Sequence, residues 1–142
     1  MTVNAILETK GHQIVSVKPD DKLSEAIRIL AEKRIGALLV MQGTRVDGIL
    51  SERDVVRVLA ERGGKVLDEP VSACMTRKVT TCSRADTVAM LMERMTTGKF
   101  RHLPVVEEGR VIGLVSIGDI VKHRVMEYES EQEALRDYIK TA

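Results

Sequence analysis

The sequence predicts an α+β fold made of two copies of one unit, each in the order β-α-β-β-α, followed by a C-terminal helical tail. The stretch GILSERD at residues 48–54 returns as GLVSIGD at residues 113–119, 65 positions later. The apolar face of one helix is also written twice, as Leu23, Ala26, Ile27 and Leu30 and then as Val88, Leu91, Met92 and Met95. Because internal repetition outranks any local motif, we expect two halves packed about a pseudo-twofold axis.

Each copy is expected to begin with a short strand, at residues 14–17 and 79–82. A helix then begins near residues 22 and 87, where acidic and hydroxyl side chains suit the free N–H groups of a helix start. Two strands joined by a tight turn follow, at 37–41 and 45–50 in the first copy and at 103–106 and 110–115 in the second. A second helix is predicted to begin at Ser51 and again at Ser116.

The predicted boundaries are residues 1–66 for the first copy, 67–126 for the second and 127–142 for the helical tail, with Gly63, Gly64 and Pro70 in the linker. Residues 3–7 and 71–75 resemble each other, so each copy has a short apolar lead-in. Because about 60 residues is near the lower limit for an independent core, we expect the copies to share one core, sheet against sheet, with two equivalent crevices at their junction. Residues 130–133 fit a capping box, and we expect the tail to pack on the body or on a partner subunit.

The composition argues against several classes of function. The net charge of +1 provides no broad field to attract nucleic acid or an anionic membrane, and three aromatic residues are too few for a base-stacking platform. No apolar run approaches the roughly 18 residues of a membrane span, and the N-terminus lacks a signal-peptide pattern. Cys74 and Cys82 are interpreted as core thiols in a reducing compartment. We therefore expect a cytoplasmic protein without nucleic-acid or membrane partners.

The repeated Ser-x-x-Asp pattern has two interpretations. Serine at the N-cap and aspartate three residues later form a capping box, which also suits the helix dipole. Alternatively, the free N–H groups of the helix start bind an anion, while Asp54 or Asp119 accepts hydrogen bonds from both hydroxyls of a ribose and Ser51 or Ser116 assists. The sequence leaves both interpretations open.

Basic residues precede the second copy of this pattern. Lys99, Arg101 and His102 stand at the head of the strand written KFRHLPVV. A guanidinium and an imidazole beside a crevice form a candidate phosphate clamp. The equivalent stretch of the first copy has Gly36 where the second has Arg101.

This twofold order of elements resembles a tandem pair of CBS domains, the Bateman module, over about residues 2–126, and in particular the stand-alone bacterial type. FRHLPVV at residues 100–106 and GLVSIGD at 113–119 are close to the family pattern, and CMTRKVTT at 74–81 is similar to the family's lead-in to the second domain. The first copy departs from the pattern at Leu39, where proline is usual, and at Gly36, which replaces the basic residue.

The resemblance implies that an adenosine nucleotide (AMP, ADP, ATP, NAD(H) or S-adenosylmethionine) binds in the crevices between the repeats. It implies that Asp54 and Asp119 hold the ribose rings. Arg53 can reach a phosphate whereas its counterpart Gly118 cannot, so two sites of unequal affinity are expected. The other candidate ligand-binding residues are Ser51, Ser116, Lys99, Arg101 and His102 near ribose and phosphate, Val15, Ser16, Thr80 and Thr81 near adenine, and Ile35, Gly36, Ala37, Ile49, Phe100, Leu114 and Ile117 around them.

Catalysis and a purely structural role are the alternatives to a sensor. The three histidines have no metal-ligand spacing, and GxSxG, P-loop and GxGxxG patterns do not occur in the sequence. We therefore expect no enzyme, no metal site and no catalytic cofactor. A structural homodimerisation scaffold without a physiological ligand stays open, because the second helices carry apolar residues such as Val56, Val121 and Val125. The favoured hypothesis is a homodimeric nucleotide sensor that acts on a separate protein effector.

Overall fold

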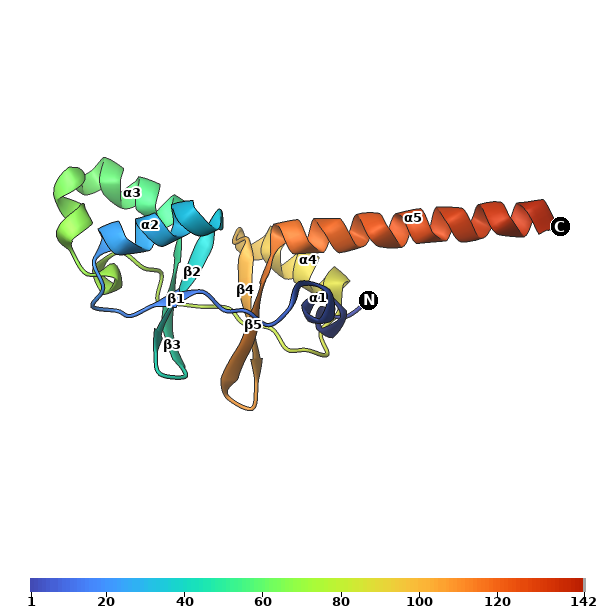
Figure 1. Ribbon diagram of the computed structural model, residues 1–142, viewed down its shortest axis with the longest axis horizontal. Helices are drawn as coiled ribbons and strands as arrows, with labels where there is room; N and C mark the ends of the chain where they lie inside the picture. Colours follow the sequence, from blue (N-terminus) through green and yellow to red (C-terminus); the bar gives the residue numbers. More distant parts are fainter. Residues whose placement is uncertain (142) are drawn as a thin grey trace.

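A computed structural model of the chain describes residues 1–141. Figure 1 shows two halves side by side, each with a β-hairpin and helices, and one long helix projecting from the second half. The elements in order are α1 (Val3–Lys10), β1 (Ser16–Val17), α2 (Leu23–Lys33), β2 (Ala37–Gln42), β3 (Arg45–Ser51), α3 (Glu52–Arg62), the 3-10 helices η1 (Gly64–Asp68) and η2 (Val71–Ala73), α4 (Val88–Gly98), β4 (His102–Glu107), β5 (Arg110–Ser116) and α5 (Ile117–Thr141). The predicted α+β class and the repeated helix-hairpin-helix order are confirmed.

The first half contains a three-stranded sheet in the order β1-β2-β3. β1 runs parallel to β2, with Ser16 opposite Leu39, and β2 and β3 form an antiparallel hairpin. The Leu39 N–H donates to the carbonyl of Val15 at 3.3 Å, which extends the β1 ladder by one hydrogen bond beyond the strand. The three predicted strands of this half are therefore present, although the first is only two residues long.

In the second half the strand predicted at residues 79–82 is wrong. β4 and β5 form a two-stranded sheet, and only Cys82 bridges to it, opposite Val105. The reason lies in Pro104, which takes the place of Leu39 in the repeat. Proline has no N–H, so the hydrogen bond that Leu39 gives to Val15 has no equivalent with Thr80, and the parallel ladder ends early.

Both hairpins carry an irregularity at the same place. The strand register shifts between Val40 and Met41 in the first half and between Val105 and Val106 in the second. The glycines opposite these points, Gly48 and Gly113, are closely covered by the lead-ins. A Cβ on Gly48 would lie 2.7 Å from the backbone oxygen of Thr76, and one on Gly113 would lie 2.6 Å from Cδ2 of Leu7. At Gly48 the close approach of a backbone atom therefore requires glycine, whereas at Gly113 the neighbouring atoms belong to the end of a leucine side chain.

The two glycines are expected to differ in their sensitivity to alanine. Gly48→Ala collides with a backbone atom, so it is expected to lower the free energy of unfolding by about 2–3 kcal/mol, within the usual range for overpacking. Gly113→Ala meets the end of a leucine side chain, which can change rotamer, so about 1 kcal/mol is expected. Urea denaturation of both variants checks the order, and equal losses would contradict it.

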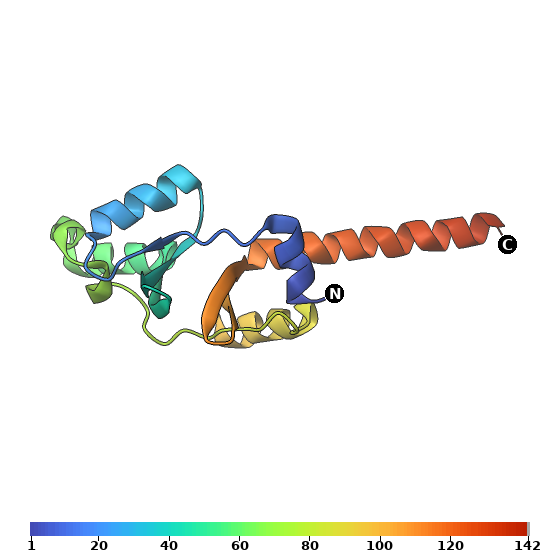
Figure 2. The ribbon, with the colours of Figure 1, turned by 60° about the horizontal axis from the view of Figure 1, so that its bottom comes forward.

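The hydrophobic core does not match the expectation of one shared core, because each half has its own cluster. The lead-ins are exchanged between them: α1 packs in the second half, as Figure 2 shows, and the linker segment packs in the first. The first cluster contains Val17, Leu23, Ala26, Leu30, Leu38, Val40, Leu50 and Val58 together with Val66, Val71, Cys74 and Met75 of the linker. The second contains Val3, Ile6 and Leu7 of α1 together with Cys82, Val88, Leu91, Met95, Leu103, Val105, Val115 and Ile120. Each sequence copy thus completes the core of the other.

The C-terminal helix α5 is continuous over 25 residues, so the helix start predicted at residues 130–133 is wrong. Neither glycine nor proline follows Gly118, so nothing in the sequence interrupts the helix. Ile120 and His123 are buried against the body, whereas Leu135 and Ile139 are well exposed. The tail therefore does not pack on its own body. Among residues 1–141, no helix combines the length and apolar character needed to cross a membrane.

Candidate functional site

The two Ser-x-x-Asp stretches form capping boxes at the starts of α3 and α5. The Ser51 N–H donates to Oδ2 of Asp54 at 3.0 Å, and the Asp54 N–H donates to Oγ of Ser51 at 3.2 Å. The same pair joins Ser116 and Asp119, at 2.9 and 3.2 Å. The capping interpretation of the sequence is therefore confirmed for both copies.

Each helix start is also tied to the residue just before the first strand of its hairpin. The Glu52 N–H donates to the carbonyl of Gly36 at 3.0 Å, and the Ile117 N–H donates to the carbonyl of Arg101 at 2.8 Å. These are equivalent positions of the repeat. The bonds hold the first turn of α3 beside the start of β2 and the first turn of α5 beside the start of β4. Residues that are 15 or more positions apart in the sequence are thus brought to one place in each half.

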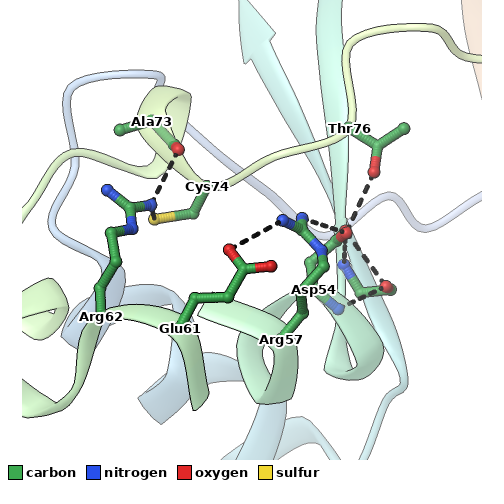
Figure 3. Close-up of polar contacts among 8 residues, drawn as sticks. Asp54, Arg57, Glu61, Arg62, Ala73, Cys74 and Thr76 are labelled. Carbon is green, nitrogen blue, oxygen red and sulfur yellow. Dashed lines mark hydrogen bonds and ion pairs between the residues drawn. The ribbon is translucent and has the colours of Figure 1, made fainter. Parts of the chain in front are cut away.

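The Asp54 carboxylate is fully engaged by the chain. Its Oδ2 accepts from both N–H and Oγ of Ser51, and its Oδ1 accepts from Arg57 at 3.1 Å and from Oγ1 of Thr76 at 3.1 Å. Figure 3 shows Asp54 between the side chains of Arg57 and Thr76. Only 8% of the residue is exposed. These contacts join α3 to the linker and leave few lone pairs for a ligand.

The Asp119 carboxylate has fewer partners. Its Oδ2 accepts from the Ser116 N–H and, at 2.7 Å, from Nζ of Lys10, which also donates to the carbonyl of Leu114 at 2.8 Å. Within residues 1–141 its Oδ1 accepts no hydrogen bond, and 21% of the side chain is exposed. Burial raises the pKa of this carboxyl, but the bonds from Lys10 and the Ser116 N–H outweigh it, so the pKa lies below its ordinary value. Asp119 is therefore an ionised acceptor with one oxygen available.

The two halves meet beside these helix starts. A Cβ on Gly36 would lie 3.3 Å from Cε1 of His102, so the backbone just before β2 lies beside the imidazole at the start of β4. Nη1 of Arg53 lies 3.4 Å from the carbonyl oxygen of Lys99, which is a second contact across the junction. A side chain at position 36 would therefore press on the His102 ring and require the ring to shift by a few tenths of an ångström.

His102 is the titratable group at the centre of this junction. Burial lowers the pKa of its imidazole below the ordinary value, and the neighbouring positive charge of Lys10 acts in the same direction. Asp119 and Glu52 oppose the shift but do not reverse it. The neutral form of the imidazole is therefore favoured at pH 7, and added negative charge nearby would raise its pKa again.

The structure brings part of the predicted site together. Gly36, Arg53, Lys99, His102 and Asp119 lie around the junction through the contacts above, and Ser51 and Ser116 cap the adjoining helices. The predicted adenine residues Thr80 and Thr81 are exposed, and Val15 packs on the first hydrophobic cluster. The predicted wall residues divide between the halves: Ile35 packs on the first cluster and Phe100 on the second, Ala37 is buried, Ile49 pairs with Thr76, and the Leu114 carbonyl accepts from Lys10. Ile117 and the predicted phosphate residue Arg101 are exposed.

Ser16 lies elsewhere. It lines an open depression of about 590 Å³ between the turn at residues 18–21 and the end of the first hairpin at residues 41–43. None of the other predicted ligand-binding residues lines this depression.

Sequence reasoning missed Lys10, Arg57 and Thr76, the partners of the two carboxylates. One signal for Lys10 was present: the offset of 68 that aligns residues 3–7 with 71–75 also aligns Lys10 with Lys78. That alignment identifies a lysine at the end of each lead-in. The alignment does not indicate that the first lead-in packs in the second half, so it could not predict the contact between Lys10 and Asp119.

Neither a reactive thiol nor a metal-binding cluster is found among residues 1–141. Burial raises the pKa of the Cys82 thiol to about 12, and burial likewise raises the pKa of Cys74. Both thiols are buried, as predicted, and a thiol with a raised pKa is a poor nucleophile. Within residues 1–141, no group of three His, Cys, Asp or Glu side chains is arranged to hold a metal ion.

Comparison with known proteins adds to this geometry. Residues 8–61 and 71–125 each match the family described as the CBS domain. The CBS domain-containing protein CBSX3, mitochondrial, of Arabidopsis thaliana is 30% identical over 148 residues, which cover 98% of this chain and 72% of the relative. The crystal structure of a CBS-domain containing protein from Agrobacterium tumefaciens superposes with a TM-score of 0.86 at 43% identity, covering 87% of this chain and 99% of the other. A CBS domain protein from Pyrobaculum aerophilum, solved in complex with AMP, has a TM-score of 0.74 at 27% identity, covering 84% of this chain and 89% of the other.

Proposed function

This chain belongs to the CBS domain family as a tandem pair of CBS domains, and on that premise we propose that it is a regulatory module that binds an adenosine nucleotide between its repeats. The observation that carries the proposal is the pair of Ser-x-x-Asp helix starts at the junction, one of them with a carboxylate oxygen available. The complex of the Pyrobaculum relative with AMP supports an adenosine ligand. The nucleotide is proposed to be AMP, ADP, ATP, NAD(H) or S-adenosylmethionine.

We assign the ribose of the higher-affinity site to the Asp119 side of the junction. A ribose diol donates two hydrogen bonds, and Asp119 has a charged Oδ1 that accepts none from the described chain, whereas both oxygens of Asp54 are engaged. The phosphate then lies near His102, Arg101 and Lys10. Because Lys10 already contacts Asp119, it needs only a rotamer change to follow the phosphate. Two sites of unequal affinity follow from this difference in engagement.

The sensing mechanism follows from the separate cores. Because each half has its own hydrophobic cluster, the halves can shift relative to each other without opening either core. A nucleotide that contacts both sides of the Gly36–His102 junction favours one relative orientation. It shifts the balance only by its differential affinity for the two orientations. A separate protein effector is proposed to read this orientation.

Titration calorimetry with AMP, ATP, NADH and S-adenosylmethionine tests the proposal, with GMP as a control for base recognition. At least one adenosine ligand is expected to bind and GMP to bind more weakly. Mass spectrometry of small molecules released from protein purified without added nucleotide identifies the ligand taken up in cells. If none of the adenosine ligands binds, the structural scaffold becomes the better hypothesis.

Binding of a phosphorylated ligand is expected to depend on pH through His102. Its pKa lies below the ordinary value in the free protein, and a nearby phosphate raises it, so binding takes up a proton. Affinity therefore increases as the pH falls through the pKa of the complex. Between pH 8 and pH 6.5 we expect a gain of about threefold for ATP.

Two controls separate this effect from general changes with pH. His102→Gln removes the titrating group, and adenosine removes the phosphate, so both are expected to give a flat profile over the same range. Calorimetry in buffers of different ionisation enthalpy counts the protons taken up. A pH dependence that persists in His102→Gln would assign the proton to another group.

A further inference from the structure

The exposed part of α5 carries a regular apolar stripe. Its members follow one another at intervals of four, three, four, three and four residues, which is the a/d spacing of a coiled coil, here kept over three heptads. The stripe consists of Val121, Val125, Tyr128, Gln132, Leu135 and Ile139. Its five apolar members are each at least half exposed. A helix face of this kind is expected to pack on another helix.

The body of the protein leaves the stripe open. Ile120 and His123 are buried against the second half, and Glu127 is half-buried. In the same heptad numbering these residues take the c and f positions, on the side of the helix opposite to a and d. The C-terminal part of α5 extends away from the body, as Figures 1 and 2 show. A second helix can therefore approach the stripe while both bodies stay on the outside.

The charges beside the stripe match a parallel, in-register copy of the same helix. In such a pair each g residue faces the e residue five positions later in the other chain. Arg124 then faces Glu129 of the second copy, and Glu131 faces Arg136 of the second copy. Each pair is made twice by symmetry, giving four opposite-charge contacts. Glu129, Glu131 and Arg136 form no ion pair within residues 1–141, whereas Arg124 contacts Glu127 at 3.0 Å along the same helix.

An antiparallel arrangement pairs the charges badly. The antiparallel register that aligns the two stripes sets Val125 against Leu135, Val121 against Ile139 and Tyr128 against Gln132 of the other chain. It also sets Glu129 against Glu129, Glu131 against Glu131 and Lys122 against Arg136. Like charges at these positions are unfavourable. In the parallel arrangement Gln132 instead meets Gln132, and a single polar residue at an a position specifies register.

We propose that the C-terminal half of α5 forms a parallel two-stranded coiled coil with a second copy of this chain. The occupant of the stripe is the identical stripe of the second copy. This interface is distinct from the nucleotide junction and does not depend on any ligand. It places the two bodies at the same end of the paired helices.

Sedimentation equilibrium of the whole chain tests the interface. A monomer–dimer equilibrium is expected, and Leu135→Glu is expected to raise the dimer Kd by about 100-fold, because both copies lose a buried leucine. Ala134→Glu introduces the same side chain one position away, on the outer side of the helix, and is expected to leave the Kd within about twofold. A chain that is monomeric at all concentrations, or a dimer that Leu135→Glu does not weaken, would overturn the proposal.

Cross-linking through introduced cysteines tests the orientation. In the parallel arrangement the two copies of Val125→Cys lie at the same level and are expected to form a disulfide under mild oxidation. In the antiparallel arrangement they lie about 15 Å apart along the axis, beyond the reach of a disulfide. A mixture of Val125→Cys and Leu135→Cys chains provides a second test of the parallel against the antiparallel arrangement. A preferred disulfide between residues 125 and 135 of different chains would show that the helices are antiparallel.

Discussion

Replacing Leu7 with alanine is expected to lower the free energy of unfolding by about 3 kcal/mol. Leu7 belongs to α1 at the beginning of the chain, yet it is fully buried in the hydrophobic cluster of the second half, over Gly113. Truncation leaves a cavity between α1 and β5. Urea denaturation followed by circular dichroism measures the loss, and the hydrogen exchange of α4 and β5 is expected to accelerate more than that of α2 and β2.

Two variants make this result specific. Glu8→Ala changes an exposed neighbour in the same helix and is expected to alter stability by less than about 0.5 kcal/mol. The double variant Leu7→Ala with Gly113→Ala places a methyl group in the space that Leu7 vacates. It is therefore expected to be more stable than the sum of the single losses predicts. If Leu7→Ala weakens the first half instead, the exchange of the lead-ins is incorrect.

Replacing Asp119 with alanine is expected to weaken adenosine-nucleotide binding by about 10- to 100-fold. The carboxylate is ionised and keeps one oxygen available for ribose hydroxyls, and a hydrogen bond to a charged group contributes about 1.5–3 kcal/mol. The variant also loses the cap of α5 and the contact with Lys10, so a loss of stability of about 1 kcal/mol accompanies it. Calorimetry measures the affinity and urea denaturation measures the stability.

Asp54→Ala is the matched control within the same chain. The four hydrogen bonds of its carboxylate hold Ser51, Arg57 and Thr76, so we expect about 2 kcal/mol of lost stability and less than a threefold change in affinity for the nucleotide at Asp119. Asp119→Asn keeps an oxygen for the Ser116 N–H but removes the charge. It is expected to retain the stability while losing most of the affinity. If Asp119→Ala destabilises the fold with binding unchanged, its role is capping alone.

Much of the fold was predictable because the sequence contains two copies of the same unit, and each copy supports the assignment made for the other. The starts of α3 and α5 follow from a hydroxyl at the N-cap and a carboxylate three residues later, and this local rule is satisfied in both copies. The strand at residues 79–82 failed for a reason also visible in the sequence, since Pro104 removes the N–H that the ladder needs. The strand was predicted from residues 79–82 alone, without considering the residues of β4 with which it would pair.

The destination of the lead-ins was not predictable in this way. Residues 3–7 and 71–75 are equally apolar, and nothing in their composition says which half each one completes. The partners of Asp54 and Asp119 depend on that crossing, because Thr76 arrives with the linker and Lys10 with α1. The sequence thus indicated the two carboxylates but not how differently they are engaged. That difference decides which of them is available to a ligand.

The exchange of the lead-ins has a consequence for synthesis on the ribosome. The apolar face of α1 leaves the exit tunnel about 100 residues before its partners in β5 and α5. The first half can close its core once residue 75 has emerged, while α1 waits unpaired in solution or on a chaperone. During that interval the exposed leucine and isoleucine side chains favour contact with other nascent chains. Slow translation after residue 75 is therefore expected to increase misassembly between neighbours on the same message.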